Sequence, residues 1–545
     1  MTEPPQPPPN QPPSPSGYGH LPGPPQQAYG YPPQGGNPYA QQPPTVPQPP
    51  VQPGGYGFPP PGAPGAPGAP GGPPSRRGKG PVIIAAAVAG VLVLGGGAWF
   101  AFGSGDDPKR PVAQGSAPAD PKPSGSPSVD KGDGSGNGAP EQTDLNAGRK
   151  PGEDKVLWLK TVKLQATGDI GIPTKGQWVV GDTIAKTLGN AVVGYGVADG
   201  KEKWKIGLPT EVCGLAPQTT ADGKTVVIVK DGAGSNANCN QLKQIDLKAG
   251  KEGWTKEVVK EGLFDGGGSA ALSLTGDTVA VNRLGGTSAY RVSTGDKLFS
   301  GSVPEGCQPT QYTAGGGKML GTALCMDADH TIEVQDADPV TGKKSWAYRL
   351  AKGWQVNGVY SVSPAVLDIG NRETKERAVI ALTADGKKRS TMAAEGKFAV
   401  NCGASILDDL QGCGEAAVDG DTLYLMTDGG KNANNEIVAF DLATGKPKWR
   451  QAAGDKRGLA PLKAANGQLI AYHSGALDEP GEIVSFPAAG GAPTTLLRLP
   501  SGPAAKIEGS FLFSSRAYVD GRFFLSVTSL AGNSTDEKFL MAFGK

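Results

Sequence analysis

The chain has 545 residues, and its 52 basic and 51 acidic side chains leave a formal net charge of +1. A nearly neutral chain has no electrostatic footprint for nucleic acid, so that class of partner is excluded. The average composition hides three N-terminal segments that differ from the rest of the chain.

Residues 1–80 hold 28 of the 51 prolines, with glycine, glutamine, scattered tyrosine and four charged side chains. Such a composition cannot bury a core, so we expect a disordered, partly polyproline-like cytoplasmic tail. A proline-reading partner domain for this tail is the alternative to a plain flexible extension.

Residues 81–102 carry no charge over 22 positions. As a helix this segment is about 33 Å long, enough for a bilayer core of roughly 30 Å. Three basic residues at 76–79 precede it, and Asp106 and Asp107 follow it. The positive-inside rule then predicts a single-pass cell-membrane protein with a cytoplasmic N-terminus and an extracytoplasmic C-terminal domain.

Residues 103–154 consist mainly of glycine, serine, proline, aspartate and lysine, which predicts a flexible extracytoplasmic linker. Helical periodicity is nearly absent in 155–545. Short β-branched and aromatic runs alternate there with clusters of glycine, aspartate and asparagine. We therefore predict a separate all-β domain over 155–545.

One motif recurs along this domain. Its fullest copy is Ala439-Phe-Asp-Leu-Ala-Thr-Gly-Lys-Pro-Lys-Trp449, and two other strong copies end at Trp204 and Trp254. Successive turn glycines are 50, 45, 47, 44, 59 and 45 residues apart. The seven turn glycines are Gly200, Gly250, Gly295, Gly342, Gly386, Gly445 and Gly490. A period in this range, with several short strands in each unit, is typical of a β-propeller.

The motif has a physical logic. Aspartate or threonine can bond the backbone amides of its own turn, and glycine accepts the positive φ that closes it. A tryptophan beyond the turn is too large for one thin sheet, so it must bury its ring against a neighbouring blade. We expect five tryptophans in this docking role: Trp158, Trp204, Trp254, Trp346 and Trp449.

The two ends of the domain predict how the ring closes. Residues 539–545 match the third strand and turn of a unit, whereas 155–164 resemble a fourth strand with Trp158 at the docking position. Pairing both ends in one blade hides the last sheet edge. Seven turns and this composite blade predict eight four-stranded blades. Seven blades stay the alternative, because the weak copy at Gly490 can be an insertion. Within the longest interval, 398–413 is expected to project as a loop.

All six cysteines follow residue 200, which suits an oxidising compartment. Six cysteines permit fifteen pairings, and consecutive pairing keeps each bridge within one unit or its entry loop. We expect the bridges Cys213–Cys239, Cys307–Cys325 and Cys402–Cys413. A metal site is disfavoured because the chain has no Cys-x-x-Cys.

Catalysis needs a nucleophile with a base, a metal cluster or a carboxylate pair. The domain has two histidines, His330 and His473, which lie far apart in the sequence. Both are expected to be structural or to face solvent. The sequence therefore assigns no catalytic, cofactor-binding or metal-binding residue.

The motif completed at Trp449 resembles the tryptophan-docking motif of pyrroloquinoline-quinone-like β-propeller repeats, of the membrane-anchored bacterial type. The resemblance covers about 155–545. That family includes quinoprotein alcohol dehydrogenases, a lipoprotein that scaffolds outer-membrane protein assembly, and outward-facing sensor domains of bacterial Ser/Thr kinases. The dehydrogenases carry a disulfide between adjacent cysteines, a bound calcium and a catalytic aspartate. No two cysteines are neighbours here, so the resemblance implies the fold without a cofactor or a catalytic residue.

We therefore expect a non-enzymatic binding, scaffold or sensor module for a protein or cell-envelope ligand at a face of the propeller. Rigid blades that present variable loops suit recognition. Two alternatives stay open: a quinone-dependent oxidoreductase, and a carbohydrate-binding or hydrolytic propeller.

Overall fold

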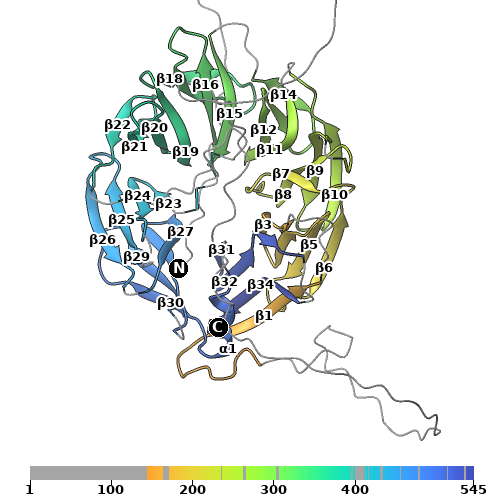
Figure 1. The fold of residues 1–545 in the computed structure, drawn as a ribbon, viewed down its shortest axis with the longest axis vertical. Helices are drawn as coiled ribbons and strands as arrows, with labels where there is room; N and C mark the ends of the chain where they lie inside the picture. Colours follow the sequence, from red (N-terminus) through yellow and green to blue (C-terminus); the bar gives the residue numbers. More distant parts are fainter. Residues whose placement is uncertain are drawn as a thin grey trace, which may run out of the picture. The chain divides into compact units, whose positions relative to one another are not determined.

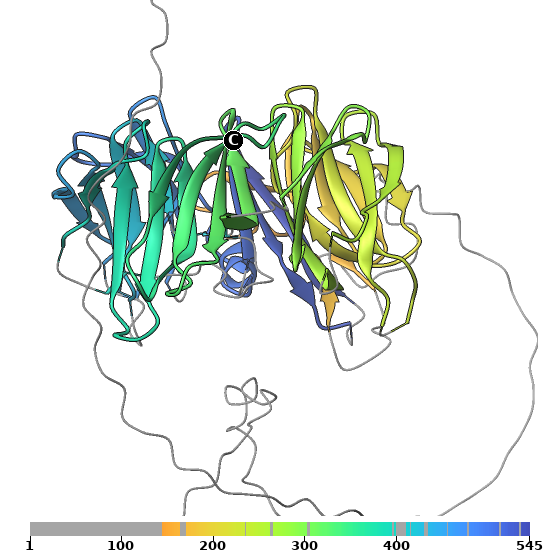
Figure 2. The same cartoon turned by 90° about the horizontal axis from the view of Figure 1, so that it is seen from above.

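The computed structural model describes residues 144–163, 171–234, 236–261, 265–301, 306–394, 397–398, 410–411, 413–414, 416–429, 434–454, 456–476, 479–511, 514–532 and 536–545. These residues belong to one compact unit, Lys122–Lys545. They form a ring of small sheets, seen down the ring axis in Figure 1 and edge-on in Figure 2.

The described residues form eight four-stranded antiparallel sheets, numbered here as blades 1 to 8. Blade 1 is β3 (Gln177–Val180), β4 (Thr183–Thr187), β5 (Ala191–Gly196) and β6 (Glu202–Gly207). Blade 2 is β7 (Val212–Leu215), β8 (Lys224–Lys230), β9 (Cys239–Asp246) and β10 (Lys251–Glu257). Blade 3 is β11 (Gly266–Thr275), β12 (Thr278–Leu284), β13 (Gly286–Arg291) and β14 (Lys297–Ser300). Blade 4 is β15 (Cys307–Gly315), β16 (Lys318–Cys325), β17 (Ile332–Ala337) and β18 (Lys344–Arg349).

The remaining four blades are built in the same way, and the strands of every blade are given from the innermost to the outermost. Blade 5 is β19 (Trp354–Val362), β20 (Ala365–Asn371), β21 (Arg377–Leu382) and β22 (Lys388–Thr391). Blade 6 is β23 (Ala416–Asp419), β24 (Thr422–Met426), β25 (Glu436–Asp441) and β26 (Pro447–Ala452). Blade 7 is β27 (Leu459–Ala465), β28 (Gln468–His473), β29 (Glu482–Pro487) and β30 (Thr494–Arg498). Blade 8 is β31 (Ser514–Val519), β32 (Arg522–Val527), β34 (Glu537–Gly544) and β1 (Lys155–Val162).

Blade 8 joins the two ends of the domain. Its outer strand β1 pairs with β34 near the C-terminus, with Val156 opposite Phe543 and Trp158 opposite Ala542. A short second pair, β2 (Ile172–Pro173) with β33 (Ser529–Leu530), adds to this closure. The prediction of eight four-stranded blades closed by both terminal strands is confirmed.

The core lies between the blades. Buried apolar side chains form eight clusters among the described residues, and each cluster joins two neighbouring blades. In β8, Val226 and Ile228 pack toward blade 3, whereas Val227 and Val229 pack toward blade 1. Successive side chains of a strand point to opposite faces, so a strand buried on both faces must be apolar throughout.

The docking tryptophans link these blades at their outer strands. Each of the seven turn glycines has a φ between +63° and +87°. The ring of a docking residue lies against the turn glycine of the next blade, Trp158 against Gly200 and Trp449 against Gly490. Phe299 takes the same place against Gly342. Backbone atoms of Thr391 fill this place at Gly445, because blade 5 has no aromatic residue there.

Between blades 7 and 8 the described residues form no docking turn. Residues just before β1 replace it. Asp154 N donates to Arg498 O at 2.7 Å, and Arg498 N donates to Asp154 Oδ2 at 2.9 Å. Ser501 N donates to Glu153 Oε2 at 2.9 Å. The described end of the expected linker, 144–154, is thus bonded to the ring.

Two of the three expected disulfides lie wholly within the described residues. Cys213–Cys239 joins β7 to β9, and Cys307–Cys325 joins β15 to β16. Cys413 is also disulfide-bonded. Its expected partner Cys402 lies outside the described residues.

Two expectations need correction. In the described part of the chain no helix is long and apolar enough to cross a bilayer, so the predicted single-pass localisation is withdrawn. Helix α1 (Pro503–Glu508) has six residues, about 9 Å against a bilayer core of roughly 30 Å. The expected span 81–102 and the tail 1–80 lie outside the described residues.

The second correction concerns the long interval before Gly445. The segment 398–413 is expected to project from the ring, but two of its described residues, Leu410 and Gln411, pack against blades 5 and 4. Leu410 is buried, and its carbonyl accepts a hydrogen bond of 2.8 Å from Val359 N on the inner strand β19. Apolar burial against blade 5 holds this residue inside the ring.

Candidate binding groove on the turn face

The ring has two unlike faces. Because the strands of each blade alternate in direction, the turn after the first strand and the docking turn after the third strand share one face. We call it the turn face. The opposite face, the linker face, carries the middle turns and the connections between blades.

A groove of about 550 Å³ crosses the turn face from blade 4 to blade 6. Its lining is mostly apolar, with four charged side chains. The lining residues are Lys318, Leu320, Asp336, Trp346, Val362, Ser363, Pro364, Ala365, Leu382, Thr383, Ala384, Arg389, Gly420 and Asp421. Blade 4 therefore contributes strand residues, and blades 5 and 6 contribute turns, to one continuous site.

The docking residue Trp346 forms part of this groove and differs from three of its four tryptophan counterparts. Trp158, Trp254 and Trp449 each donate their indole N–H to a carbonyl of the next blade, at 3.1, 2.7 and 3.1 Å. The ring of Trp346 lies against Gly386. Among the described residues its Nε1 meets no acceptor and is not buried. An indole donor is thus left unused at the groove.

The charges of the groove are separated along its length. At blade 4, Lys318 Nζ lies 3.5 Å from Asp336 Oδ2, and the lysine side chain is 55% exposed against 12% for the aspartate. At blade 6 the order is reversed. Arg389 Nη1 lies 2.9 Å from Asp421 Oδ1, with side chains 25% and 69% exposed. Solvent therefore meets a cation at one end and a carboxylate at the other.

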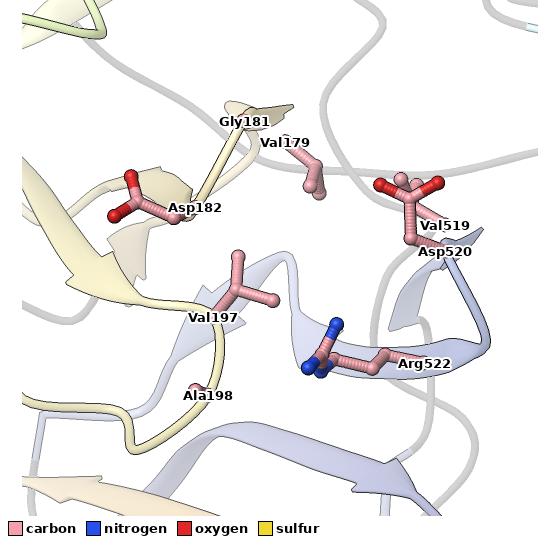
Figure 3. A pocket seen from close by; sticks show the side chains of 8 residues that line it. All are labelled: Val179, Gly181, Asp182, Val197, Ala198, Val519, Asp520 and Arg522. Atoms are coloured by element: carbon pink, nitrogen blue, oxygen red, sulfur yellow. The ribbon is translucent and has the colours of Figure 1, made fainter.

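The equivalent seam between blades 8 and 1 is smaller. Its pocket has a volume of about 170 Å³ and is shown in Figure 3. Arg522 there corresponds to Lys318, and Asp182 and Asp520 lie on opposite sides of the opening. The indole of Trp158 is bonded to Val197 O at this seam. Both pockets thus lie on the turn face where neighbouring blades meet, and the one at blades 4 to 6 is the larger of the two.

Side-chain amides link the neighbouring blades 2, 3 and 4 to one another and to Gln411 of the long insertion. Gln411 Nε2 donates to Ala314 O at 2.6 Å, and Ala314 N donates to Gln411 Oε1 at 3.1 Å. Gln218 Nε2 donates to the same Oε1 at 3.3 Å, while Leu274 N donates to Gln218 Oε1 at 2.9 Å. Residues of blades 2, 3 and 4 and the long insertion thus occupy the inside of the ring together.

The carboxyl group of Glu508 is buried on the linker face. Tyr472 Oη donates to Glu508 Oε1 at 2.5 Å, and Gly481 N donates to Oε2 at 3.2 Å. Burial raises the pKa of Glu508, and burial together with the nearby carboxylate raises the pKa of Tyr472. Glu508 belongs to α1 and Tyr472 to β28. The pair joins blades 7 and 8, which is a structural role.

A buried lysine lies inside blade 1. Lys186 is fully buried, and its ammonium donates to Thr174 O. Burial lowers the pKa of Lys186 to about 7. No carboxylate pairs with it among the described residues. A buried group without access to solvent cannot meet a substrate, so we do not assign it to the candidate site.

The two histidines of the domain are far from the groove. His330 is exposed, with a φ of 47°, and lies between blade 4 strands. His473 Nε2 lies 2.7 Å from Ala453 O, and burial lowers its pKa. One group of possible metal ligands occurs in the described chain: Cys307, Cys325 and Glu333. Its two sulfurs are bonded to each other, so they are not available as thiolate ligands.

A family model described as "Outer membrane protein assembly factor BamB" matches residues 148–323 and 330–491. The chain belongs to this family of pyrroloquinoline-quinone-like β-propeller repeats. No curated protein matches the chain.

Solved structures with similar folds have low sequence identity. BamB from Moraxella catarrhalis is 14% identical, covers 72% of this chain and 100% of its own, and has a TM-score of 0.38. Quinohemoprotein alcohol dehydrogenase from Comamonas testosteroni is 14% identical, covers 74% and 78%, and has a TM-score of 0.42. At these scores neither likeness bears on function.

The described residues of this propeller do not match the residue set with which quinoprotein dehydrogenases hold their quinone and calcium. The cysteines of its two described bridges are 26 and 18 residues apart, and each bridge joins strands of one blade. Gln218 and Gln411 occupy the inside of the ring with hydrogen bonds to the chain itself. We therefore derive no reaction through a quinone.

Sequence reasoning located the docking tryptophans but not the groove. Trp346 was expected only to pack between blades. One feature of the sequence does set this position apart, because the docking turn before Gly386 is one residue shorter than the turn before Gly445. Gly386 N donates to Thr383 O, three residues back, at 3.0 Å, whereas Gly445 N donates to Asp441 O, four residues back. The turn before Gly490 is equally short, yet Trp449 finds an acceptor there. The turn length alone was therefore insufficient.

Proposed function

We propose that this propeller is a non-enzymatic scaffold that binds another protein through its turn face. The groove over blades 4 to 6 carries this proposal. It combines a buried apolar floor, an indole without an acceptor in the described chain, and exposed charges of both signs, all held by the blades of the ring. Protein-binding sites commonly join an apolar centre to a polar rim.

The inside of the ring supports the same proposal. Gln218 and Gln411 bond each other and the backbone of Leu274 and Ala314, so their amides are used within the chain and are not offered to a ligand. Family membership is compatible with a scaffold, because the matched family model describes an assembly factor.

Site-specific photo-crosslinking tests this proposal. A benzophenone amino acid is placed at Ala384, an exposed residue of the groove, or at Lys506, an exposed residue of α1 on the linker face. The full chain is expressed in its native host and irradiated. We expect a discrete protein adduct from position 384 and none from position 506. The same adduct from both positions, or none from 384, contradicts the proposal.

The oxidoreductase alternative has its own assay. The purified full chain is mixed with pyrroloquinoline quinone, Ca²⁺ and an artificial electron-accepting dye, over a panel of primary alcohols. We expect no dye reduction and no quinone retained after gel filtration. Reduction of the dye above the quinone blank would overturn the non-enzymatic assignment.

A further inference from the structure

We infer that the groove binds an extended peptide segment of the partner, with an acidic residue over blade 4, apolar residues in the middle and a basic residue over blade 6. This inference rests on the proposed function and adds the chemistry of the partner. It is carried by the order in which charge, apolar surface and the indole donor follow one another along the groove.

The middle of the groove favours an extended backbone with small apolar side chains. Pro364, Ala384 and the ring of Trp346 are the apolar side chains that reach its surface. Leu320, Val362 and Leu382 are buried beneath them. Such a surface gains free energy by covering aliphatic groups. A volume of about 550 Å³ is too large for one side chain and matches a short run of residues.

The indole of Trp346 supplies the directional contact. An extended peptide leaves backbone carbonyls unpaired along its length, and each can accept an N–H. Trp346 Nε1 has no acceptor within the described chain, unlike the indoles of Trp254 and Trp449. A peptide carbonyl over blade 4 would satisfy it.

The charges give the peptide its polarity. Lys318 is held by a mostly covered Asp336, which also accepts from Ser345 Oγ at 2.6 Å. Solvent therefore meets the ammonium at this end. At the other end Asp421 is exposed above a mostly covered Arg389. Opposite charges on a partner would complement both ends, whereas a polyanion such as nucleic acid would meet repulsion at Asp421.

The test uses three fluorescein-labelled peptides with the same Ala-Pro-Leu-Ala centre. Their flanking residues are Glu and Lys, Glu and Glu, or Lys and Lys. Spacers of zero to two glycines on each side adjust the reach. Fluorescence anisotropy with the full chain is expected to show the tightest binding for the Glu/Lys peptide. Equal affinity for all three peptides, or no binding by any, would overturn the inference.

Two variants assign the contacts. Lys318→Glu should shift the preference to the Lys/Lys peptide, by about tenfold relative to the wild type. Trp346→Phe keeps the ring against Gly386 but removes the donor, and should weaken the Glu/Lys peptide about fivefold. Trp449→Phe is the matched control, since its indole is already bonded to Ala488 O, and should leave peptide affinity unchanged. A preference that stays the same in Lys318→Glu contradicts the inference.

Failure of the peptides is distinct from failure of the scaffold proposal. If the crosslinker at Ala384 captures a partner but the peptides do not compete with it, the scaffold proposal is supported and the inference that the groove binds an extended peptide is wrong. If neither crosslinking nor peptide binding occurs, both are wrong.

Discussion

Trp158 and Gly200 are the residues through which the first described strand fastens to the next blade. A Cβ built on Gly200 would lie 2.5 Å from Trp158 Cδ2, and the indole donates to Val197 O at 3.1 Å. The glycine is therefore required twice, for its φ of +66° and for the space above it. An aromatic ring lies in the same way against Gly250, Gly295, Gly342, Gly386 and Gly490, so most neighbouring blades are fastened by this contact.

Replacing such a glycine should destabilise the ring strongly. We expect Gly200→Ala to lower the free energy of unfolding by roughly 3 kcal/mol, from overpacking and backbone strain together. Gly276→Ala is the matched control, because its φ is +57° and nothing lies within 4 Å of a built Cβ. The control should lose only about 1 kcal/mol. Equal midpoints in urea unfolding of the two variants would contradict this account of docking.

The docking indoles differ in what their N–H contributes. Trp254 Nε1 donates to Val292 O at 2.7 Å, whereas Trp204 Nε1 is buried without a partner. Trp254→Phe should therefore cost about 1 kcal/mol more than Trp204→Phe, because the second change removes an unsatisfied donor. Thermal unfolding of the two variants measures this difference. A larger loss of stability for Trp204→Phe than for Trp254→Phe would show that the packing of the ring, and not its N–H, sets the stability contribution of a docking indole.

Lys186 should make stability depend on pH in the alkaline range. Its pKa of about 7 in the folded protein lies below the ordinary value of 10.5, so the unfolded chain binds the proton more tightly. The stability present above pH 10.5 is thus lost as the pH falls toward 7, by at most ~1.4 kcal/mol for each pH unit.

Replacement by an apolar side chain should remove this dependence. We expect Lys186→Met to be more stable than the wild type at pH 7, with a flatter profile of unfolding free energy between pH 7 and 10. Urea titrations at several pH values measure both. Loss of stability at pH 7 in Lys186→Met would show that the bond from Lys186 to Thr174 O outweighs the desolvation of the ammonium.

The repeated motif made the architecture predictable because its elements are local. An acidic turn, a glycine with positive φ and a tryptophan four residues on recur as a unit, as at Asp441, Gly445 and Trp449. The closing blade was also predictable, since β1 carries the docking Trp158 and residues 539–545 match the third strand of a unit.

The position of the insertion and the groove could not be predicted, because they depend on contacts between residues far apart in the sequence, which no local pattern encodes. Gln411 bonds Ala314, which is 97 residues away, and Gln218, which is 193 residues away. These contacts of Gln411 could not be derived from the composition of the insertion. The groove likewise needs three blades to be in place before Lys318 and Asp421 lie on one surface.

The proposal that the groove is the binding site is tested most directly by blocking it. Ala384 is exposed on the groove wall, so Ala384→Arg should fill the site without disturbing the core. Isothermal titration of the partner identified by crosslinking should then show affinity reduced at least about tenfold, with an unchanged melting temperature. Full affinity in the Ala384→Arg variant would place the binding site elsewhere on the ring and contradict the account.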